Sequence, residues 1–102
     1  GARPETLEDI RRKVSEYMDG KAWDDLKQIE QQLDYPLDDP YRRFIFQDIQ
    51  KQIEPRIRHY VQALSEQQDG DIVQTVTDKV NNDIYEGVKE FIEKLKHGES
   101  PS

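Results

Sequence analysis

Cysteine is absent from this sequence, glycine is scarce, and no long apolar run occurs. Without cysteine, disulfide bonds, thiol chemistry and cysteine-ligated zinc sites are excluded. The 5 glycines are scattered, so no glycine-rich loop can hold a phosphate through its backbone N–H groups. Because no apolar run exceeds three residues, we expect neither a membrane-spanning helix nor a signal-peptide core. These absences favour an intracellular protein without a membrane segment.

Residues able to carry out catalysis are also scarce. The two histidines, His59 and His97, have no recognisable catalytic partner in the sequence and are typical of surface and helix-end positions. The stretch Asp69–Val80 begins like a calcium-binding loop but lacks the central glycine and the closing glutamate. The nucleophile elbow and the two-histidine zinc motif are absent. We therefore expect no enzymatic activity, no cofactor and no bound metal.

Apolar residues recur at intervals of three and four along most of the chain, which is typical of amphipathic α-helices. Asp19-Gly20, Tyr35-Pro36 and Gly70 interrupt this pattern with residues that end helices or form turns. Four such helices joined by short links predict an all-α fold, an antiparallel four-helix bundle. The predicted helices are about Pro4–Met18, Lys21–Leu33, Pro40–Leu64 and Asp71–Lys96.

The third predicted helix contains Pro55. A proline inside a helix removes one hydrogen bond and clashes with the preceding turn, at a cost of about 3 kcal/mol. The apolar stripes before and after Pro55 nevertheless keep nearly the same phase. We expect the helix either to kink at Pro55 or to restart there, giving four or five helices. At its beginning we expect Asp39 as the N-cap and Pro40 in the first helical position.

The length of 102 residues predicts one domain. Only 33% of the residues are hydrophobic and 36% are charged, so the sequence allows a small core and a heavily charged surface. We expect a single helical bundle domain over residues 4–98. Residues 1–3 are expected to be disordered or derived from an expression tag, and residues 99–102 to form a disordered tail.

The net charge of −7 is unevenly distributed along the chain. Residues 1–40 carry six cations and eleven anions, and residues 61–102 carry four cations and nine anions. Residues 41–60, with five cations and two anions, form the one positive segment. This distribution indicates that any recognition of an acidic partner depends on residues 41–60.

Arginine and aromatic side chains alternate in this positive segment, and both types commonly dominate the energetics of protein interfaces. Phe44 lies about 100° away from the main apolar stripe of its predicted helix, so it does not easily face the same core. Either that helix packs on two sides, or Phe44 belongs to an exposed apolar groove. The candidate partner-binding residues are Tyr41, Arg42, Arg43, Phe44, Lys51, Arg56, Arg58 and His59.

Three interpretations of the arginines remain open at this stage. They pair with carboxylates of the other helices, they bind an acidic or phosphate-bearing partner, or they bind nucleic acid. Arg42 projects near the apolar stripe of its helix, and Glu30 interrupts the apolar side of the helix before it. The periodicity does not establish which carboxylate lies near which arginine.

The pattern favours a non-enzymatic protein–protein interaction module that docks an acidic or amphipathic peptide segment of a larger intracellular assembly. Phe44 and Tyr41 would anchor the partner, and the arginines would orient it. The alternative is a helical RNA- or DNA-binding domain that uses the Arg42–Arg58 segment. A further alternative is self-association through an apolar side of the third and fourth helices. No motif in the sequence assigns the chain to a family.

Overall fold

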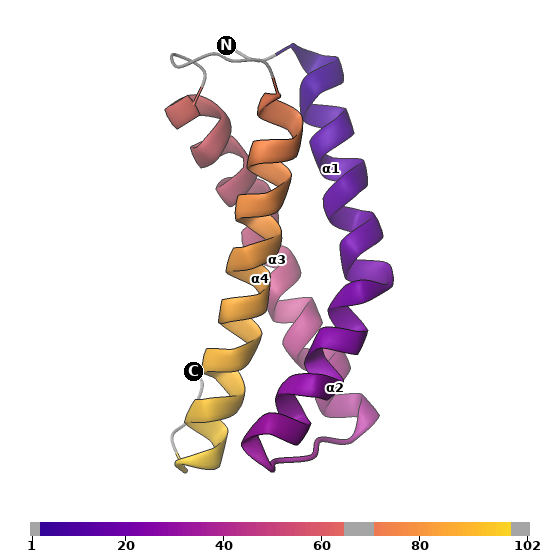
Figure 1. Cartoon of the computed structure of the whole chain (residues 1–102), viewed down its shortest axis with the longest axis vertical. Helices are drawn as coiled ribbons and strands as arrows, with labels where there is room; N and C mark the ends of the chain where they lie inside the picture. Colours follow the sequence, from indigo (N-terminus) through magenta and orange to yellow (C-terminus); the bar gives the residue numbers. More distant parts are fainter. Residues whose placement is uncertain (1–2, 65–70, 99–102) are drawn as a thin grey trace.

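Four helices account for most of the chain. The computed structural model describes residues 3–64 and 71–98, and no strand occurs in these two ranges. The predicted all-α four-helix fold is therefore confirmed. The predicted turn at Gly70, residues 1–2 and the tail 99–102 lie outside the described residues. The helices are α1 (Pro4–Asp19), α2 (Lys21–Leu33), α3 (Asp39–Leu64) and α4 (Ile72–Lys96) (Figure 1).

The two short helices α1 and α2 follow each other along the long axis of the molecule, beside the long helices α3 and α4 (Figure 1). α3 and α4 have 26 and 25 residues. At about 1.5 Å per residue, each helix spans most of the 42 Å length of the molecule. α1 and α2 have 16 and 13 residues, so only the pair spans that length. The break between them is at Gly20, whose backbone leaves the helical region.

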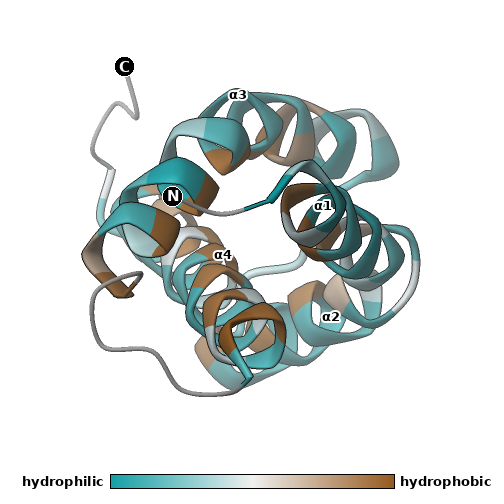
Figure 2. Ribbon diagram, turned by 90° about the horizontal axis from the view of Figure 1, so that it is seen from above, coloured by the Kyte–Doolittle hydropathy of each residue, from teal (hydrophilic) through white to brown (hydrophobic). Residues whose placement is uncertain are grey.

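The hydrophobic core is organised around α4, which packs against each of the other three helices. Viewed from above, the apolar sides of the helices face a common interior (Figure 2). Val76, Val80 and Ile92 of α4 are fully buried there, together with Ile10 of α1 and Leu26 of α2. The interval of three or four residues between buried positions is the one predicted from the sequence, because it places them on one side of each helix.

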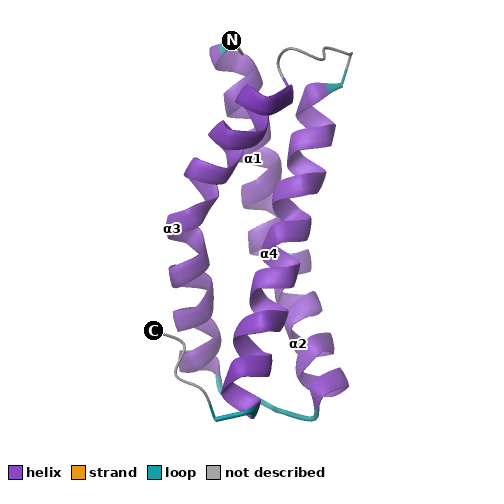
Figure 3. Cartoon of the chain, turned by 90° about the vertical axis from the view of Figure 1, so that its left-hand side faces the viewer, coloured by secondary structure: helices purple, strands orange, loops and turns teal. Residues whose placement is uncertain are grey.

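Pro55 lies within α3, which continues from Asp39 to Leu64 without restarting. The axis of α3 bends along this course (Figure 3), as expected for a proline that removes a hydrogen bond inside a helix. Ile45 and Ile57, on opposite sides of the proline, are both fully buried. The apolar stripe therefore continues across the bend, and of the two predicted alternatives the kinked helix is observed.

The N-terminus of α3 differs from the prediction by one residue. The side chain of Asp38, not that of Asp39, accepts a hydrogen bond from the backbone N–H of Tyr41, at 3.1 Å. Asp39 is instead the first residue of the helix, and its carboxylate contacts Arg42 at 2.7 Å. In a run of two aspartates either one can cap, and the backbone path after Leu37 selects the first.

Removing a buried side chain of α4 should strongly destabilise the protein, because α4 contacts every other helix. We expect Ile92→Ala to lower the free energy of unfolding by about 2–5 kcal/mol, as is usual when a fully buried isoleucine is truncated. Urea denaturation followed by far-ultraviolet circular dichroism measures this loss. The control Glu86→Ala, on the exposed side of the same helix, should change the midpoint little. Equal effects of the two variants would contradict the central position of α4.

Candidate interaction surface

Arg42, one of the predicted partner-binding residues, is held inside the molecule. Its Nε and Nη2 groups donate hydrogen bonds to the two carboxylate oxygens of Glu30, both at 2.8 Å. A third hydrogen bond runs from Nη1 to the carboxylate of Asp39, at 2.7 Å. The side chain of Arg42 is 19% exposed and that of Glu30 only 5%. Arg42 therefore joins α3 to α2 and is not available to a partner.

The Glu30 carboxylate also organises the connection between α2 and α3. It accepts the backbone N–H of Leu37 at 3.0 Å, in addition to the two bonds from Arg42. Burial raises the pKa of Glu30, but the hydrogen bonds from Arg42 and Leu37 and the positive charge of Arg42 outweigh it. The net effect holds the pKa of Glu30 below its ordinary value of 4.5. The carboxylate is thus charged at neutral pH and fixes the chain that leads into α3.

Two more of the predicted cations have partners within the chain. Arg58 contacts Glu54 at 2.9 Å, and Glu54 also receives two hydrogen bonds from Arg11 of α1, at 2.7 and 2.8 Å. Arg56 contacts Asp83 of α4 at 3.0 Å. The Arg11–Glu54 pair links α3 to α1 and the Arg56–Asp83 pair links it to α4, whereas the Arg58–Glu54 pair lies within α3. The side chains of these pairs are partly exposed to solvent, and Asp83 is the most buried of them. Each pair therefore contributes modestly to stability.

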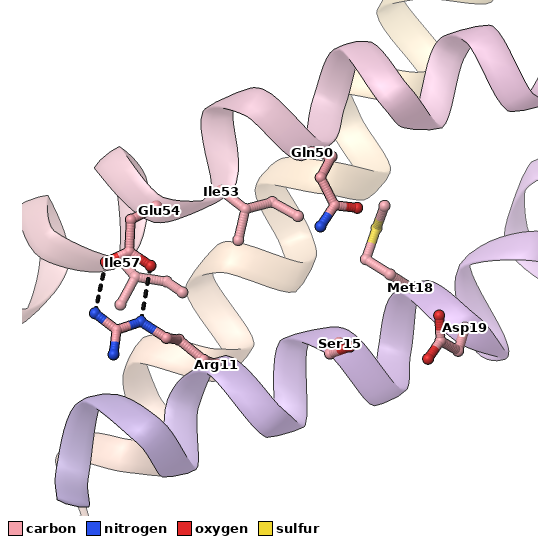
Figure 4. A pocket seen from close by; sticks show the side chains of 8 residues that line it. All are labelled: Arg11, Ser15, Met18, Asp19, Gln50, Ile53, Glu54 and Ile57. Atoms are coloured by element: carbon pink, nitrogen blue, oxygen red, sulfur yellow. Dashed lines mark hydrogen bonds and ion pairs between the residues drawn. The ribbon is translucent and has the colours of Figure 1, made fainter. Parts of the chain in front are cut away.

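The contact between α1 and α3 leaves a hollow of about 290 Å³ (Figure 4). The Arg11–Glu54 pair closes one end of it, and the side chains of Met18, Ile53 and Ile57 project between the two helices. Hydrogen bonding by Arg11 is the largest influence on Glu54 and lowers the pKa of its carboxyl group. The charges at this end are therefore mutually satisfied, so the hollow offers an acidic partner no available cation.

Arg43 and Lys51 differ from the three predicted arginines above because neither forms an ion pair within the described residues. Both side chains are exposed, and both line an open hollow of about 570 Å³ between α2 and α3. Trp23 and Phe46 also line this hollow, with ring centroids 4.7 Å apart. Gln47 and Gln50 complete the lining, so none of its six described residues is acidic. We call this site the α2–α3 hollow.

The α2–α3 hollow exists because these two helices do not pack closely. In the described part of the chain, no Cα atom of α2 comes within 8 Å of a Cα atom of α3. The gap is bridged at one level by the Glu30–Arg42 pair and at another by the contact of Trp23 with Phe46. Trp23 was not among the predicted site residues, although it is the only tryptophan in the sequence. Its role depends on the distance between helices, which helical periodicity does not determine.

Phe44 and Tyr41 lie on the side of α3 that faces α4. Their ring centroids are 5.8 Å apart, and those of Phe44 and Phe91 of α4 are 6.2 Å apart. Tyr41 and Phe91 complete the group at 6.4 Å. Phe44 is 51% exposed and is the one exposed large hydrophobic side chain among the described residues. Phe44 thus contacts α4 through its ring while about half of its surface stays exposed, so the structure combines features of both alternatives.

The predicted partner-binding residues therefore divide between two sides of α3. The cations without partners, Arg43 and Lys51, line the hollow toward α2, whereas Phe44 contacts Phe91 of α4. His59 is exposed, and its ring lies 5.4 Å from that of Tyr60. Lys51 and His59 also line a second open hollow, of about 470 Å³, that includes Pro55.

The fold and the surface together define an all-α domain with two open hydrophobic surfaces. No group of three or more potential ligands that could hold a metal ion occurs in residues 3–64 or 71–98. None of the helices seen in those ranges is both long enough and apolar enough to cross a lipid bilayer.

Comparison with known proteins assigns the domain to a family. Residues 2–96 match the family described as spore germination protein GerPC. The chain is also similar to a protein of Bacillus cereus named "Probable spore germination protein GerPC", with 31% identity over 91 residues. The aligned region covers 89% of this chain and 43% of that relative, so the chain spans less than half of the relative's length. No solved structure matches. This chain belongs to the GerPC spore germination protein family.

Removing the charge of Glu30 should destabilise the fold, because it leaves Arg42 in a poorly solvated position. We expect Glu30→Gln to lower the free energy of unfolding by about 3 kcal/mol, the lower end for a broken buried pair, since Asp39 still contacts Arg42. Chemical denaturation at pH 7 measures the change. As a control, Asp9→Asn removes an exposed ion pair and should have little effect. An unchanged stability of Glu30→Gln would show that the pair is not structural.

The same carboxylate predicts a dependence of stability on pH. The folded-state pKa of Glu30 is lower than the value of 4.5 expected in the unfolded chain, so its charged form stabilises the fold above pH 4.5. This contribution should disappear as the pH falls through the lowered folded-state pKa. Between pH 7 and pH 3, the free energy of unfolding should therefore decrease less for Glu30→Gln than for the unsubstituted protein, as measured by denaturation at each pH. Equal decreases in the two proteins would contradict this role of Glu30.

Proposed function

We propose that this domain is a non-enzymatic docking module that binds an acidic amphipathic helix of another protein. The observation that carries the proposal is the α2–α3 hollow. It combines two cations that have no partner in the described chain with an aromatic floor and no acidic lining residue. In a chain with 22 acidic residues and a net charge of −7, a hollow without an acidic lining residue suits an acidic partner; the neighbouring hollow at Pro55 shares this lining, but its Arg56 is already paired with Asp83.

The dimensions and chemistry of the hollow support a helical partner with one apolar side. Trp23 and the nearly buried Phe46 offer an apolar floor for a large hydrophobic side chain of the partner. Arg43 and Lys51 would contact acidic residues beside that anchor, and Gln47 and Gln50 can both donate and accept hydrogen bonds. This combination matches the mode in which an amphipathic helix lies in a groove.

The alternative of direct nucleic-acid binding receives less support from the same contacts. Arg42, Arg56 and Arg58 are already paired with carboxylates of the chain, so only part of the predicted cationic segment is available. Nucleic-acid binding draws on many phosphate contacts at once, and the acidic remainder of the surface would repel the backbone.

The family assignment supports a role for this docking module in spore germination. We propose that the partner is another protein that takes part in that process, and that the domain acts inside the spore-forming cell. The chain spans less than half of the relative's length, so the proposed role and partner concern the activity of the whole protein as well as that of this domain. A docking role needs no catalytic group, and we propose that the domain has no enzymatic activity of its own.

A nuclear magnetic resonance titration of the nitrogen-15-labelled chain tests the proposal. The probe is a 20-residue helical peptide with leucine on one side and glutamate on the other. We expect it to shift the indole N–H of Trp23 and the side-chain amides of Gln47 and Gln50, and to bind less tightly as salt rises. Arg43→Glu and Lys51→Glu should each weaken binding at least tenfold. Arg12→Glu, the same charge change on an exposed arginine of α1, is the control.

Two comparison probes make the result decisive. A peptide with lysine in place of every glutamate should not shift these resonances, because the hollow presents cations to it. A single-stranded oligonucleotide of 20 nucleotides should also fail to shift these resonances at physiological salt. Shifts that are confined to residues outside the hollow, or tighter binding of the oligonucleotide than of the acidic peptide, would refute the proposal.

A further inference from the structure

The side of α3 that faces α4 carries a projecting side chain and a hollow next to each other. Phe44 projects with 51% of its surface exposed, and its ring contacts Phe91. Phe91 also lines a hollow of about 290 Å³ between α3 and α4, together with Gly87. A cavity of roughly 150 Å³ is enough to hold a benzene ring, so the hollow is large enough for a phenylalanine side chain. We call this combination the Phe44–Gly87 face.

Gly87 makes the hollow deeper and has no packing role inside the described chain. A Cβ atom added at Gly87 would have no other atom within 4 Å, apart from its own helix backbone and neighbours. Glycine in the middle of a helix is less favourable than alanine, and α4 continues for nine residues beyond this position. The missing side chain is therefore not explained by contacts within the monomer, whereas it leaves room for a side chain from outside.

The charges of this face are nearly balanced, in contrast to the chain as a whole. Glu90 is paired with Lys94 at 3.1 Å. Asp83, four residues before Gly87 on α4, is paired with Arg56 at 3.0 Å. Asp48 also lines the hollow and forms no ion pair within the described residues. An acidic partner would find no available cation in this hollow, and a basic partner would find only Asp48. The face therefore suits a partner surface that has the same nearly balanced charges and exposed aromatic side chains.

We propose that the Phe44–Gly87 face binds a second copy of this chain across a twofold axis. A twofold contact brings the same surface of both copies together, so a projection and a hollow on one face can each receive the other. Phe44 of each copy would enter the hollow over Gly87 of its partner. The net charge of −7 disfavours most other contacts between two copies, whereas on this face every charge but that of Asp48 is paired within the chain, which limits like-charge repulsion.

This interface is distinct from the one proposed for the acidic partner. The α2–α3 hollow is lined by Arg43, Phe46 and Lys51, and none of these residues lines the hollow over Gly87. A dimer formed through the Phe44–Gly87 face would therefore present two α2–α3 hollows. Such a dimer would bind a partner with repeated acidic helices more tightly than a single domain does, because the second contact forms within the same complex.

Sedimentation equilibrium of the 102-residue chain at several concentrations tests the inference. We expect a reversible dimer whose dissociation constant rises at least tenfold in Phe44→Glu. Gly87→Leu should weaken the dimer to a similar extent by filling the hollow, and should at the same time raise the midpoint of thermal unfolding of the monomer. A weaker dimer together with a more stable monomer would show that Gly87→Leu disrupts the interface and not the fold. Gln28→Glu, on an exposed position of α2, is the control and should leave the dimer unchanged.

The outcomes also separate this inference from the proposed function. A monomer at all concentrations, or a dimer that neither Phe44→Glu nor Gly87→Leu weakens, overturns the twofold contact. A dimer that depends on Phe44 but not on Gly87 also overturns it, since the projection would then have another receptor. Phe44→Glu should still bind the acidic peptide in the α2–α3 hollow. Arg43→Glu should lose that peptide and still form the dimer.

Discussion

The packing of α4 against all three other helices is the constraint on which the rest of the structure depends. Its buried positions, from Val76 to Ile92, supply a common surface for α1, α2 and α3. Because α2 and α3 are each held by α4, they do not need to pack closely against each other. The space that remains between them is the α2–α3 hollow, so the same arrangement that closes the core also leaves a site open.

The Glu30–Arg42 pair sets the limits of that open site. It holds the start of α3 close to the end of α2, and the backbone of Leu37 is fixed by the same carboxylate. Beyond this pair the two helices separate, and Trp23 and Phe46 meet across the gap. One buried ion pair thus removes Arg42 from the surface and at the same time orients the segment that carries Arg43. Arg42, which stabilises the fold, is therefore adjacent in the sequence to Arg43, which remains available to a partner.

Most of the fold and only part of the site follow from the sequence. The four helices, the break near Gly20 and the bend at Pro55 are encoded by local periodicity and by residues that act on their own backbone. The capping residue Asp38 was missed because two adjacent aspartates satisfy the same pattern. Glu30 can be recognised in the sequence as a charged residue in an apolar stripe, but its partner Arg42 lies 12 residues away on another helix. Periodicity alone does not connect such residues.

The sequence by itself determined that the chain is helical, which residues share a side of each helix and where the positive segment lies. Only the tertiary structure decided which of those cations are paired, that Trp23 meets Phe46, and that Phe44 remains exposed. The reason is physical: the period of 3.6 residues fixes directions around one helix axis, and it is a local property. Ion pairs and hollows depend instead on the distance and rotation between helices, which the packing of all four helices sets together.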